Sequence, residues 1–326
     1  MQTHRQKKQS LIPELQHSAI PPLEEYTQNS GEITGLKGGR CPERCVERIQ
    51  KGRVSVVTVV RNSMTSLERT IDSICAQSYA DIEYIVVDGG STDGTIDILK
   101  ARNDDIDFWL SEPDRGISDA FNKGIALSTG EFITFVNADD WLESDHIELA
   151  VRSLTESEAE FSFGNLVLHD QQGAPIYSML GDPDYAKCLR HAMPALNHPT
   201  IVCRRTLYSR NGLYDLSYKI AMDYEWLLRN HLRGAIGIYI MAITSHMGAS
   251  GLSQRHIRAS LQEVRRASVA YGYHPTLAML RFFVRLSKAQ SRVFLEKILP
   301  KSIVDGMRRL ANPRFRRGSL PSGIQQ

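Results

Sequence analysis

Residues 82–96 read IEYIVVDGGSTDGTI, an apolar run that ends in an acid, two glycines and small polar residues. Apolar runs with little alternation are typical of strands that are buried on both faces of a parallel sheet. Residues 54–60 (VSVVTVV) and 132–136 (FITFV) have the same composition. The sequence therefore predicts three strands of one sheet: Val54–Val60, Ile82–Val87 and Phe132–Val136.

The segments between these runs have the composition of crossover helices. Leu67, Ile71 and Ile74 recur at helical spacing within 66–78, and residues 95–101 and 117–127 are short segments bounded by Gly, Ser or Asp. Parallel strands need such crossovers. The alternation predicts an α/β fold in which helices flank a mixed, mostly parallel sheet, and a ligand site beyond the carboxyl ends of its strands.

Four stretches carry a resemblance to a known family. VSVVTVVRN (54–62), VVDGGSTDGT (86–95), RGISDAFNKGI (115–125) and FVNADDW (135–141) resemble, in order and spacing, the signatures of family 2 glycosyltransferases. The similarity covers roughly 54–253 and implies a Rossmann-like GT-A domain over these residues. It also implies an enzyme that binds a nucleotide-sugar.

The first two motifs hold the residues that we expect to bind the nucleotide. Thr58 and Asp88 are predicted at the ends of the first two strands, and the resemblance implies that Asp88 contacts the base. Alternatively, Asp88 only stabilises the Gly89-Gly90 turn. Asp93 is most simply explained as the cap of the helix that begins near Thr95.

The third motif opens a helix whose first N–H groups could hold a diphosphate or a base. Arg115 is the expected charge partner of the phosphates, and Asn122 and Lys123 follow one or two turns later. For Lys123, the alternative is an ordinary surface lysine.

The fourth motif resembles the metal site of the family, where Asp-x-Asp is usual. Here the first acid is replaced by Asn137, and Asp139 stands at the metal-binding position. Mg²⁺ or Mn²⁺ is the expected cofactor, since hard cations select oxygen ligands. Asn137 can still hydrogen-bond a ribose or a metal-bound water, and Asp140 is either a second ligand or the cap of the following turn.

A late histidine often completes the metal shell in GT-A enzymes. His246 resembles it, in a predicted Gly- and Ser-containing loop after a strand at 236–243. The alternative is an exposed or hydrogen-bonded histidine without a metal.

The general base is expected at the start of a helix predicted over 219–229. Asp223 matches the catalytic acid of the family, with Met222 where Glu is frequent. A carboxylate there would be ionised at working pH and could take the proton of an acceptor hydroxyl. The alternative is a helix N-terminal acid that the macrodipole favours. Acceptor contacts are expected from 161–218, with His198 as one candidate.

Charge divides the 326-residue chain unevenly. Residues 1–53 are polar and predicted to be a flexible arm, residues 54–254 hold 15 basic and 28 acidic residues, and residues 255–326 hold 15 basic and 3 acidic ones. The C-terminal segment 254–326 is predicted to be a basic helical tail. Arg281, Arg285, Lys288 and Arg292 form one stripe on a helix, which suits an anionic membrane surface or a solvated face of a helix packed on the body. Nucleic acid is not an expected partner, because the tail has no recognisable nucleic-acid module.

These observations predict a cytoplasmic protein, with the tail peripheral on the inner face of the membrane. No apolar run is long enough to span a bilayer, and the five cysteines are scattered and odd in number. The expected activity is inverting, non-processive transfer of one sugar, from a UDP-linked donor to a saccharide or lipid-linked glycan of a surface polysaccharide or glycolipid. The alternatives are a non-catalytic nucleotide- or carbohydrate-binding scaffold of the same fold and a nucleotidyltransferase.

Overall fold

The computed structural model describes residue 26 and residues 35–42, 49–170, 172–248, 256–298 and 315–316. Within them, one mixed sheet has the strand order β1-β4-β3-β2-β5-β9-β7-β10-β6; off this path, β8 pairs with β7, and β11 pairs with β8. The strands are β1 (Leu36–Gly38), β2 (Gln50–Val60), β3 (Ile82–Asp88), β4 (Phe108–Ser111), β5 (Gly130–Phe135), β6 (Trp141–Leu142), β7 (Phe161–His169), β8 (Pro175–Met179), β9 (Val202–Arg204), β10 (Gly237–Gly248) and β11 (Phe315–Arg316).

The central strands β4, β3, β2 and β5 are parallel, as the apolar runs predict. Beyond β5 the sheet becomes mixed, because β9 is antiparallel to both β5 and β7, whereas β7 and β10 are parallel. The predicted class, a mostly parallel sheet with flanking helices, is confirmed.

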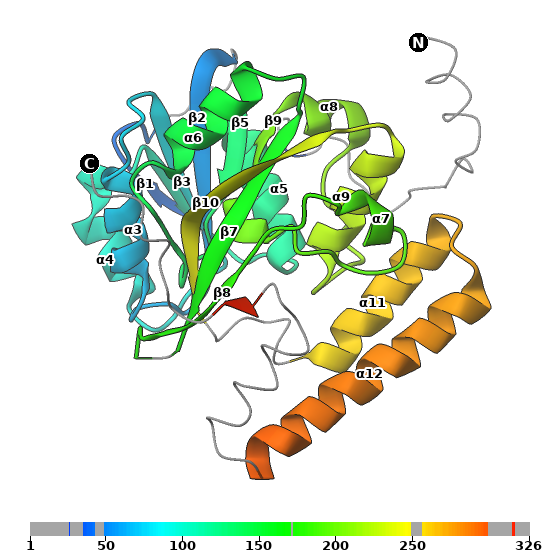
Figure 1. The fold of residues 1–326 in the computed structure, drawn as a ribbon. Helices are drawn as coiled ribbons and strands as arrows, with labels where there is room; N and C mark the ends of the chain where they lie inside the picture. The colour runs from blue at the N-terminus through cyan, green and yellow to red at the C-terminus, as the bar shows by residue number, and fades with distance from the viewer. Residues whose placement is uncertain are drawn as a thin grey trace.

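Helices cover both faces of this sheet (Figure 1). They are α3 (Leu67–Cys75), α4 (Thr95–Ala101), α5 (Ile117–Leu127), α6 (His146–Thr155), α7 (Ala186–Leu189), α8 (Thr206–Asn211), α9 (Met222–Leu232), α11 (Ile257–Ala270) and α12 (Pro275–Ile298), with 3₁₀ turns η2 (Asn103–Asp105) and η3 (His198–Thr200). Two predicted helices, α4 and α5, have the predicted bounds. Helix α9 begins three residues later than predicted.

Strand β2 shows why the central runs are apolar without alternation. Val54 and Val56 pack into one hydrophobic cluster with α3, α4 and α6, and Val57 and Val59 pack into a second one with α5, α8 and α9. Both faces of the strand are thus buried, and each buried valine contributes roughly 1.5–3 kcal/mol relative to an exposed one.

The predicted flexible arm is wrong for two short segments of residues 1–53. Leu36–Gly38 forms β1 along β4, and Gln50 to Arg53 extend β2 at its start. A segment can pair with an existing strand through its backbone alone, without a regular spacing of apolar residues. The sequence pattern therefore did not reveal these two strand segments. The other residues of the arm lie outside the described part, except Tyr26.

The predicted basic tail contains two helices, and the first packs on the body. Ser268 of α11 hydrogen-bonds Tyr224 of α9 at 2.8 Å, and Tyr271 donates to Glu225 at 2.6 Å. In α12, Arg281 and Lys288 are exposed, but Arg285 is half-buried, and its burial lowers its pKa. The four basic positions share one side of α12, but Arg285 is less exposed than Arg281 and Lys288, and the side chain of Arg292 is not described. Among the described helices, none is long and apolar enough to cross a membrane.

Candidate active site

The carboxyl ends of β3, β2 and β5 meet at one edge of the sheet, as predicted. Asp88 lies opposite Val60, and Val57 lies opposite Phe135, which places Asn137 just beyond the end of β5. Because neighbouring strands are about 4.8 Å apart, Asp88 and Asn137 stand roughly 10 Å from each other across β2.

Asp88 is fully buried and its carboxylate is occupied by its own turn. It accepts hydrogen bonds from the backbone N–H groups of Gly90 (3.1 Å) and Ser91 (2.9 Å), from the Ser91 hydroxyl, and from the Ser111 hydroxyl at 2.6 Å. The structure therefore supports the turn-stabilising alternative for Asp88. A role in base binding stays a prediction.

Thr58 is not at the surface of this site. It lies inside β2, two residues before the strand ends, and its fully buried side chain accepts a hydrogen bond from Tyr84 at 3.2 Å. The prediction that Thr58 binds the nucleotide is wrong because the strand continues to Val60. Arg61 and Asn62, which follow the strand, are exposed there instead.

The loops after β2 and β3 are bound to one another. The Asn62 side chain accepts from the N–H of Thr92 at 2.9 Å, and Asp93 accepts from the N–H groups of Met64 and Thr95 at 3.1 and 3.0 Å. The Thr95 hydroxyl, above all, lowers the pKa of Asp93. Asp93 thus binds the first N–H group of α4, although the cap position that was predicted for it is held by Gly94.

Gly89 leaves space for an acid from another loop. A Cβ atom at residue 89 would lie 2.2 Å from Oδ2 of Asp114, so Asp114 occupies the place of a side chain on this turn. The other oxygen of Asp114 accepts from the N–H of Gly116 at 2.8 Å. This acid was not predicted from the sequence, because its proximity to residue 89 depends on the tertiary fold.

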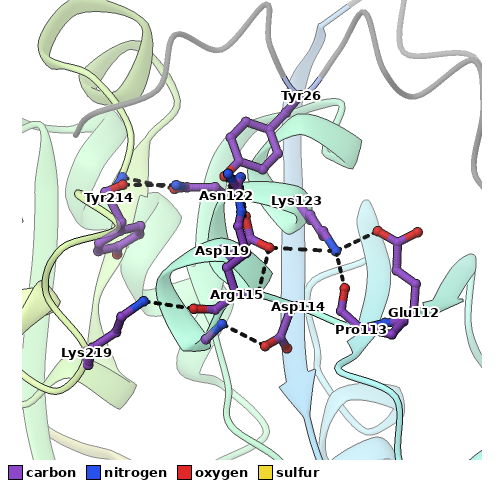
Figure 2. A network of polar contacts seen from close by, with 11 residues as sticks. Tyr26, Glu112, Pro113, Asp114, Arg115, Asp119, Asn122, Lys123, Tyr214 and Lys219 are labelled. Carbon is purple, nitrogen blue, oxygen red and sulfur yellow. Dashed lines mark hydrogen bonds and ion pairs between the residues drawn. The ribbon is translucent and has the colours of Figure 1, made fainter. Parts of the chain in front are cut away.

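Figure 2 shows the polar network at the start of α5. Asp119 is buried and accepts from Arg115, with its Nη2 at 2.8 Å and its N–H at 3.0 Å, and from the Tyr26 hydroxyl at 2.7 Å. Burial raises the pKa of Asp119, but the bonds from Arg115 and Tyr26 outweigh it, so the pKa is lower than usual. Lys123 pairs with Glu112 at 2.5 Å.

The structure does not support a diphosphate at this helix start. The N–H groups of Arg115 and Gly116 are bound to carboxylates, and both predicted cations, Arg115 and Lys123, are paired with acids. The acids in this region suit hydroxyl and N–H donors of a base or ribose better than phosphates.

The side chain of Asn122 links helix α5 to the backbone at Tyr214. It is fully buried; its amide nitrogen donates to the carbonyl of Tyr214 and its oxygen accepts from the N–H of Tyr214, both at 2.9 Å (Figure 2). The prediction that Asn122 binds the nucleotide-sugar is wrong, because its two polar atoms are used by a residue 92 positions away.

Beyond β5, Asn137, Asp139 and Asp140 differ sharply in environment. Asn137 and Asp139 are half-buried, and Oδ1 of Asn137 is buried without a hydrogen-bond partner. Asp140 is buried and accepts from Asn137 (3.1 Å) and from the N–H of Gly248 (3.3 Å); burial, followed by the charge of Asp139, raises its pKa well above the usual value. Neither donor lies in the turn that follows Asp140, so the structure does not support the capping alternative, and metal binding by Asp140 stays a prediction.

The end of β10 passes close to Asp139. A Cβ atom at residue 248 would lie 3.1 Å from Oδ2 of Asp139, which is closer than most Cβ contacts in proteins. Glycine at this position therefore lets the Asp139 side chain lie against the backbone of β10. Arg69 of α3 lies nearby, with its guanidinium 3.6 Å from the centroid of the Trp141 ring and Nη2 3.5 Å from the carbonyl of Asp139. Burial lowers the pKa of Arg69. Arg69 was not predicted because nothing distinguishes an exposed helix arginine in the sequence.

His246 was predicted in a loop, which is wrong, and as a metal ligand, which stays a prediction. It lies within β10, where it pairs with Trp141 of β6. Its Nε2 is 2.6 Å from Glu143 and its Nδ1 is 2.9 Å from His169, so both ring nitrogens are engaged. No group of three or more His, Cys, Asp or Glu side chains within the described ranges is arranged to hold a metal.

Asp223 begins α9, as predicted for the general base. It is half-buried, and burial raises its pKa, while nearby His198 works in the opposite direction. Asp223 in turn raises the pKa of His198, although burial lowers that pKa overall. The His198 ring is stacked 5.7 Å from Phe121 and 6.2 Å from Phe135. This chain of contacts joins Asp223 to the end of β5.

The segment before Asp223 is held from two sides. Lys219 donates to the carbonyl of Arg115 at 2.8 Å, which fixes the segment on the start of α5 (Figure 2). Glu263 of α11 accepts the N–H groups of Lys219, Ile220 and Ala221 at 2.9, 2.9 and 2.8 Å. The second helix layer therefore supports the position of Asp223.

The fold, a mixed and mostly parallel sheet with flanking helices, is the GT-A fold. The chain belongs to glycosyl transferase family 2, whose family model matches residues 55–216. An uncharacterized glycosyltransferase of Mycobacterium tuberculosis is 33% identical over 183 residues, which cover 54% of this chain and 68% of that protein.

Two further relatives are glycosyltransferases by name. Glycosyltransferase GlyA of Streptococcus pneumoniae is 33% identical, over 41% of this chain but only 20% of that protein. A PGL/p-HBAD biosynthesis glycosyltransferase of Mycobacterium bovis is 26% identical, over 70% of this chain and 89% of that protein.

The structures share the fold. S. aureus TarS 1–349 in complex with UDP-GlcNAc has a TM-score of 0.55 at 16% identity, covering 79% of each chain. The mannosyltransferase PcManGT from Pyrobaculum calidifontis, in complex with GDP-Man and Mn²⁺, has a TM-score of 0.53 at 17% identity, covering 95% of this chain and 93% of that one.

Proposed function

We propose that this protein transfers a single sugar, with inversion and without processivity, from a nucleotide-sugar to an acceptor hydroxyl. The observation that carries the proposal is Asp223: a half-buried carboxylate of raised pKa, linked through His198 and Phe135 to the strand end that leads to Asp139. A raised pKa makes a carboxylate a stronger base for the proton of an acceptor hydroxyl.

In this mechanism, the acceptor oxygen forms a bond to the anomeric carbon while the bond from that carbon to the diphosphate breaks. The proton of the acceptor hydroxyl passes to Asp223. His198 is half-buried beside Asp223, and burial lowers its pKa, which favours the neutral imidazole and lets the carboxylate remain the basic group. The rings of Phe121 and Phe135 stack with that of His198 and hold it in place.

The residues beyond β5 fit a divalent cation bound together with the donor. The observation that supports this fit is Oδ1 of Asn137, which is a buried oxygen without a hydrogen-bond partner and lies close in the chain to the half-buried Asp139. Asp139 and Asn137 would hold Mg²⁺ or Mn²⁺, a ligand count that suits Mg²⁺, which usually uses one or two carboxylates plus substrate phosphates. A bound cation supplies positive charge to the leaving diphosphate.

The donor side is proposed as follows. Phosphates lie near Asp139 and Arg69, where a cation and a guanidinium can meet them. The base lies near Asp88 and Asp114, where the half-buried carboxylate of Asp114 can accept its N–H groups. A UDP-linked donor is our preferred choice, and UDP-GlcNAc is the ligand of the TarS structure. A saccharide or lipid-linked glycan is the proposed acceptor, on the cytoplasmic side of the membrane.

The experiment is a donor panel. The purified chain is mixed with UDP-, GDP- and dTDP-sugars, with and without MnCl₂, and nucleoside diphosphate release is measured together with donor binding by calorimetry. Asp223→Asn is expected to bind the donor and to release almost no nucleoside diphosphate. Asp97→Asn, an exposed acid of α4, is the matched control and should behave as wild type.

Two outcomes would contradict the proposal. Donor binding without release in the wild type, with an acceptor extract present, would indicate the scaffold alternative. Release of pyrophosphate from a nucleoside triphosphate would indicate the nucleotidyltransferase.

A further inference from the structure

Helix α12 presents an apolar face to solvent. Of the eleven large hydrophobic side chains that are exposed among the described residues, six belong to this helix: Leu277, Met279, Leu280, Phe283, Val284 and Ile298. The opposite face is covered, since Ala278 and Phe282 are buried and line a small cavity together with Leu261 and Val264 of α11. Figure 1 shows α12 as the outer helix of the pair, with α11 between it and the sheet.

The exposed apolar residues share one side of the helix. Leu277, Leu280 and Val284 stand at i, i+3 and i+7, which places them on one face, and Phe283 lies beside them. Their exposed fractions are 49%, 61%, 45% and 58%. Packing against α11 does not require any of these side chains, because it uses the opposite face.

Two exposed cations border this face. Arg281 follows Leu277 by four residues and Lys288 follows Val284 by four, so each lies one turn further along nearly the same line of the helix. An apolar face flanked by Arg and Lys is the pattern of a helix that lies in the membrane interface.

Charge separates this region from the rest of the molecule. The described residues 256–298 hold eight basic and two acidic residues, whereas residues 54–254 hold 15 basic and 28 acidic ones. An anionic surface therefore attracts the helix pair and repels the catalytic body.

We propose that the exposed face of α12, defined by Leu277, Leu280, Phe283, Val284, Arg281 and Lys288, docks on an anionic lipid bilayer. A second copy of the chain would bring two basic faces together, which is unfavourable. Nucleic acid would use the cations but not the apolar side chains. A bilayer with anionic headgroups satisfies both kinds of residue. The inference does not depend on the proposed function.

The experiment is co-sedimentation of the full-length protein with vesicles of phosphatidylcholine, with or without phosphatidylglycerol. Binding is expected only with the anionic lipid and is expected to weaken as salt is added. Neutralising Arg281 and Lys288 (R281Q, K288Q) should weaken binding about five-fold for each cation removed. The double variant Leu280→Asp, Phe283→Asp should weaken it by about tenfold or more.

Matched controls are Met241→Asp, an exposed apolar residue of β10, and Lys100→Glu, an exposed cation of α4; both should bind as wild type. Thermal unfolding of every variant verifies that α12 still packs on α11. The proposal is overturned if the wild type binds neither vesicle, or if it binds neutral vesicles equally well. It is also overturned if the Leu280→Asp, Phe283→Asp variant changes only the oligomeric state measured by light scattering, which would assign the face to a second copy.

Discussion

Glu263 offers the sharpest prediction on how the C-terminal helices serve the catalytic residue. Its carboxylate accepts three backbone N–H groups directly before Asp223, at 2.8–2.9 Å. Hydrogen bonds to a charged group contribute about 1.5–3 kcal/mol each, and water can replace those at the exposed side, so we expect Glu263→Ala to cost about 3 kcal/mol of unfolding free energy. The corresponding fall in Tm is about 5 °C or more.

Turnover should fall more than stability alone explains. Without the three acceptors, the segment 219–221 moves, and a displacement of Asp223 by about 1 Å can cost up to 100-fold in rate. The assay is nucleoside diphosphate release at saturating donor, below the unfolding temperature. We expect kcat to fall by about tenfold or more, with the KM for the donor little changed.

Glu263→Gln separates charge from hydrogen bonding. The amide oxygen can keep part of the bonds, but the negative charge that raises the pKa of Asp223 is lost. The acidic limb of the pH profile of kcat should therefore move to lower pH. Gln262→Ala, at the exposed neighbouring position on α11, is the control. Wild-type kcat, pH profile and Tm in both Glu263 variants would refute the reasoning.

Four further predictions follow from the site. Because burial raises the pKa of Asp223, activity should be lost on acidification at a pH above the usual aspartate range, as a pH profile of kcat would show. The same burial disfavours the ionised form in the folded state, so stability is lost as pH rises through the raised pKa; Asp223→Asn should raise Tm at pH 7, which calorimetry can check. Asn122→Ala leaves both backbone groups of Tyr214 unpaired and should cost about 3 kcal/mol of unfolding free energy in urea titrations, with donor KM unchanged; a selective loss of donor binding would contradict this. Asp139→Asn should raise the Mn²⁺ concentration needed for half-maximal activity, whereas His246→Gln should lower Tm and leave that concentration unchanged; the reverse pattern would restore His246 as a ligand.

Local patterns predicted the centre of this fold well. The strands β2, β3 and β5 and the helices α4 and α5 follow from apolar runs and their bounding Gly, Ser and Asp residues, because such signals act within a few positions. The place of Asp223 near the start of a helix was also predicted, from the family motif, although α9 begins three residues later than expected.

Predictions that depended on distant partners failed for a physical reason. Asn122 looked available for a ligand, but its partner Tyr214 is 92 residues away, and His246 looked like a loop residue because the pairing of β10 with β6 and β7 has no local signature. Arg69 and Asp114 reach the site only through tertiary packing. For the same reason, the predicted boundaries of the arm, the domain and the tail did not anticipate that β1 pairs with β4, or that Glu263 binds the segment before Asp223.

The central claim is that Asp223 takes the acceptor proton at an edge that it shares with Asp139. Its most direct test is single-turnover sugar transfer by Asp223→Asn at saturating donor and Mn²⁺. A rate about 100- to 10,000-fold below wild type, with the donor bound as tightly as before, is the expected result. A rate within about twofold of wild type would contradict the claim.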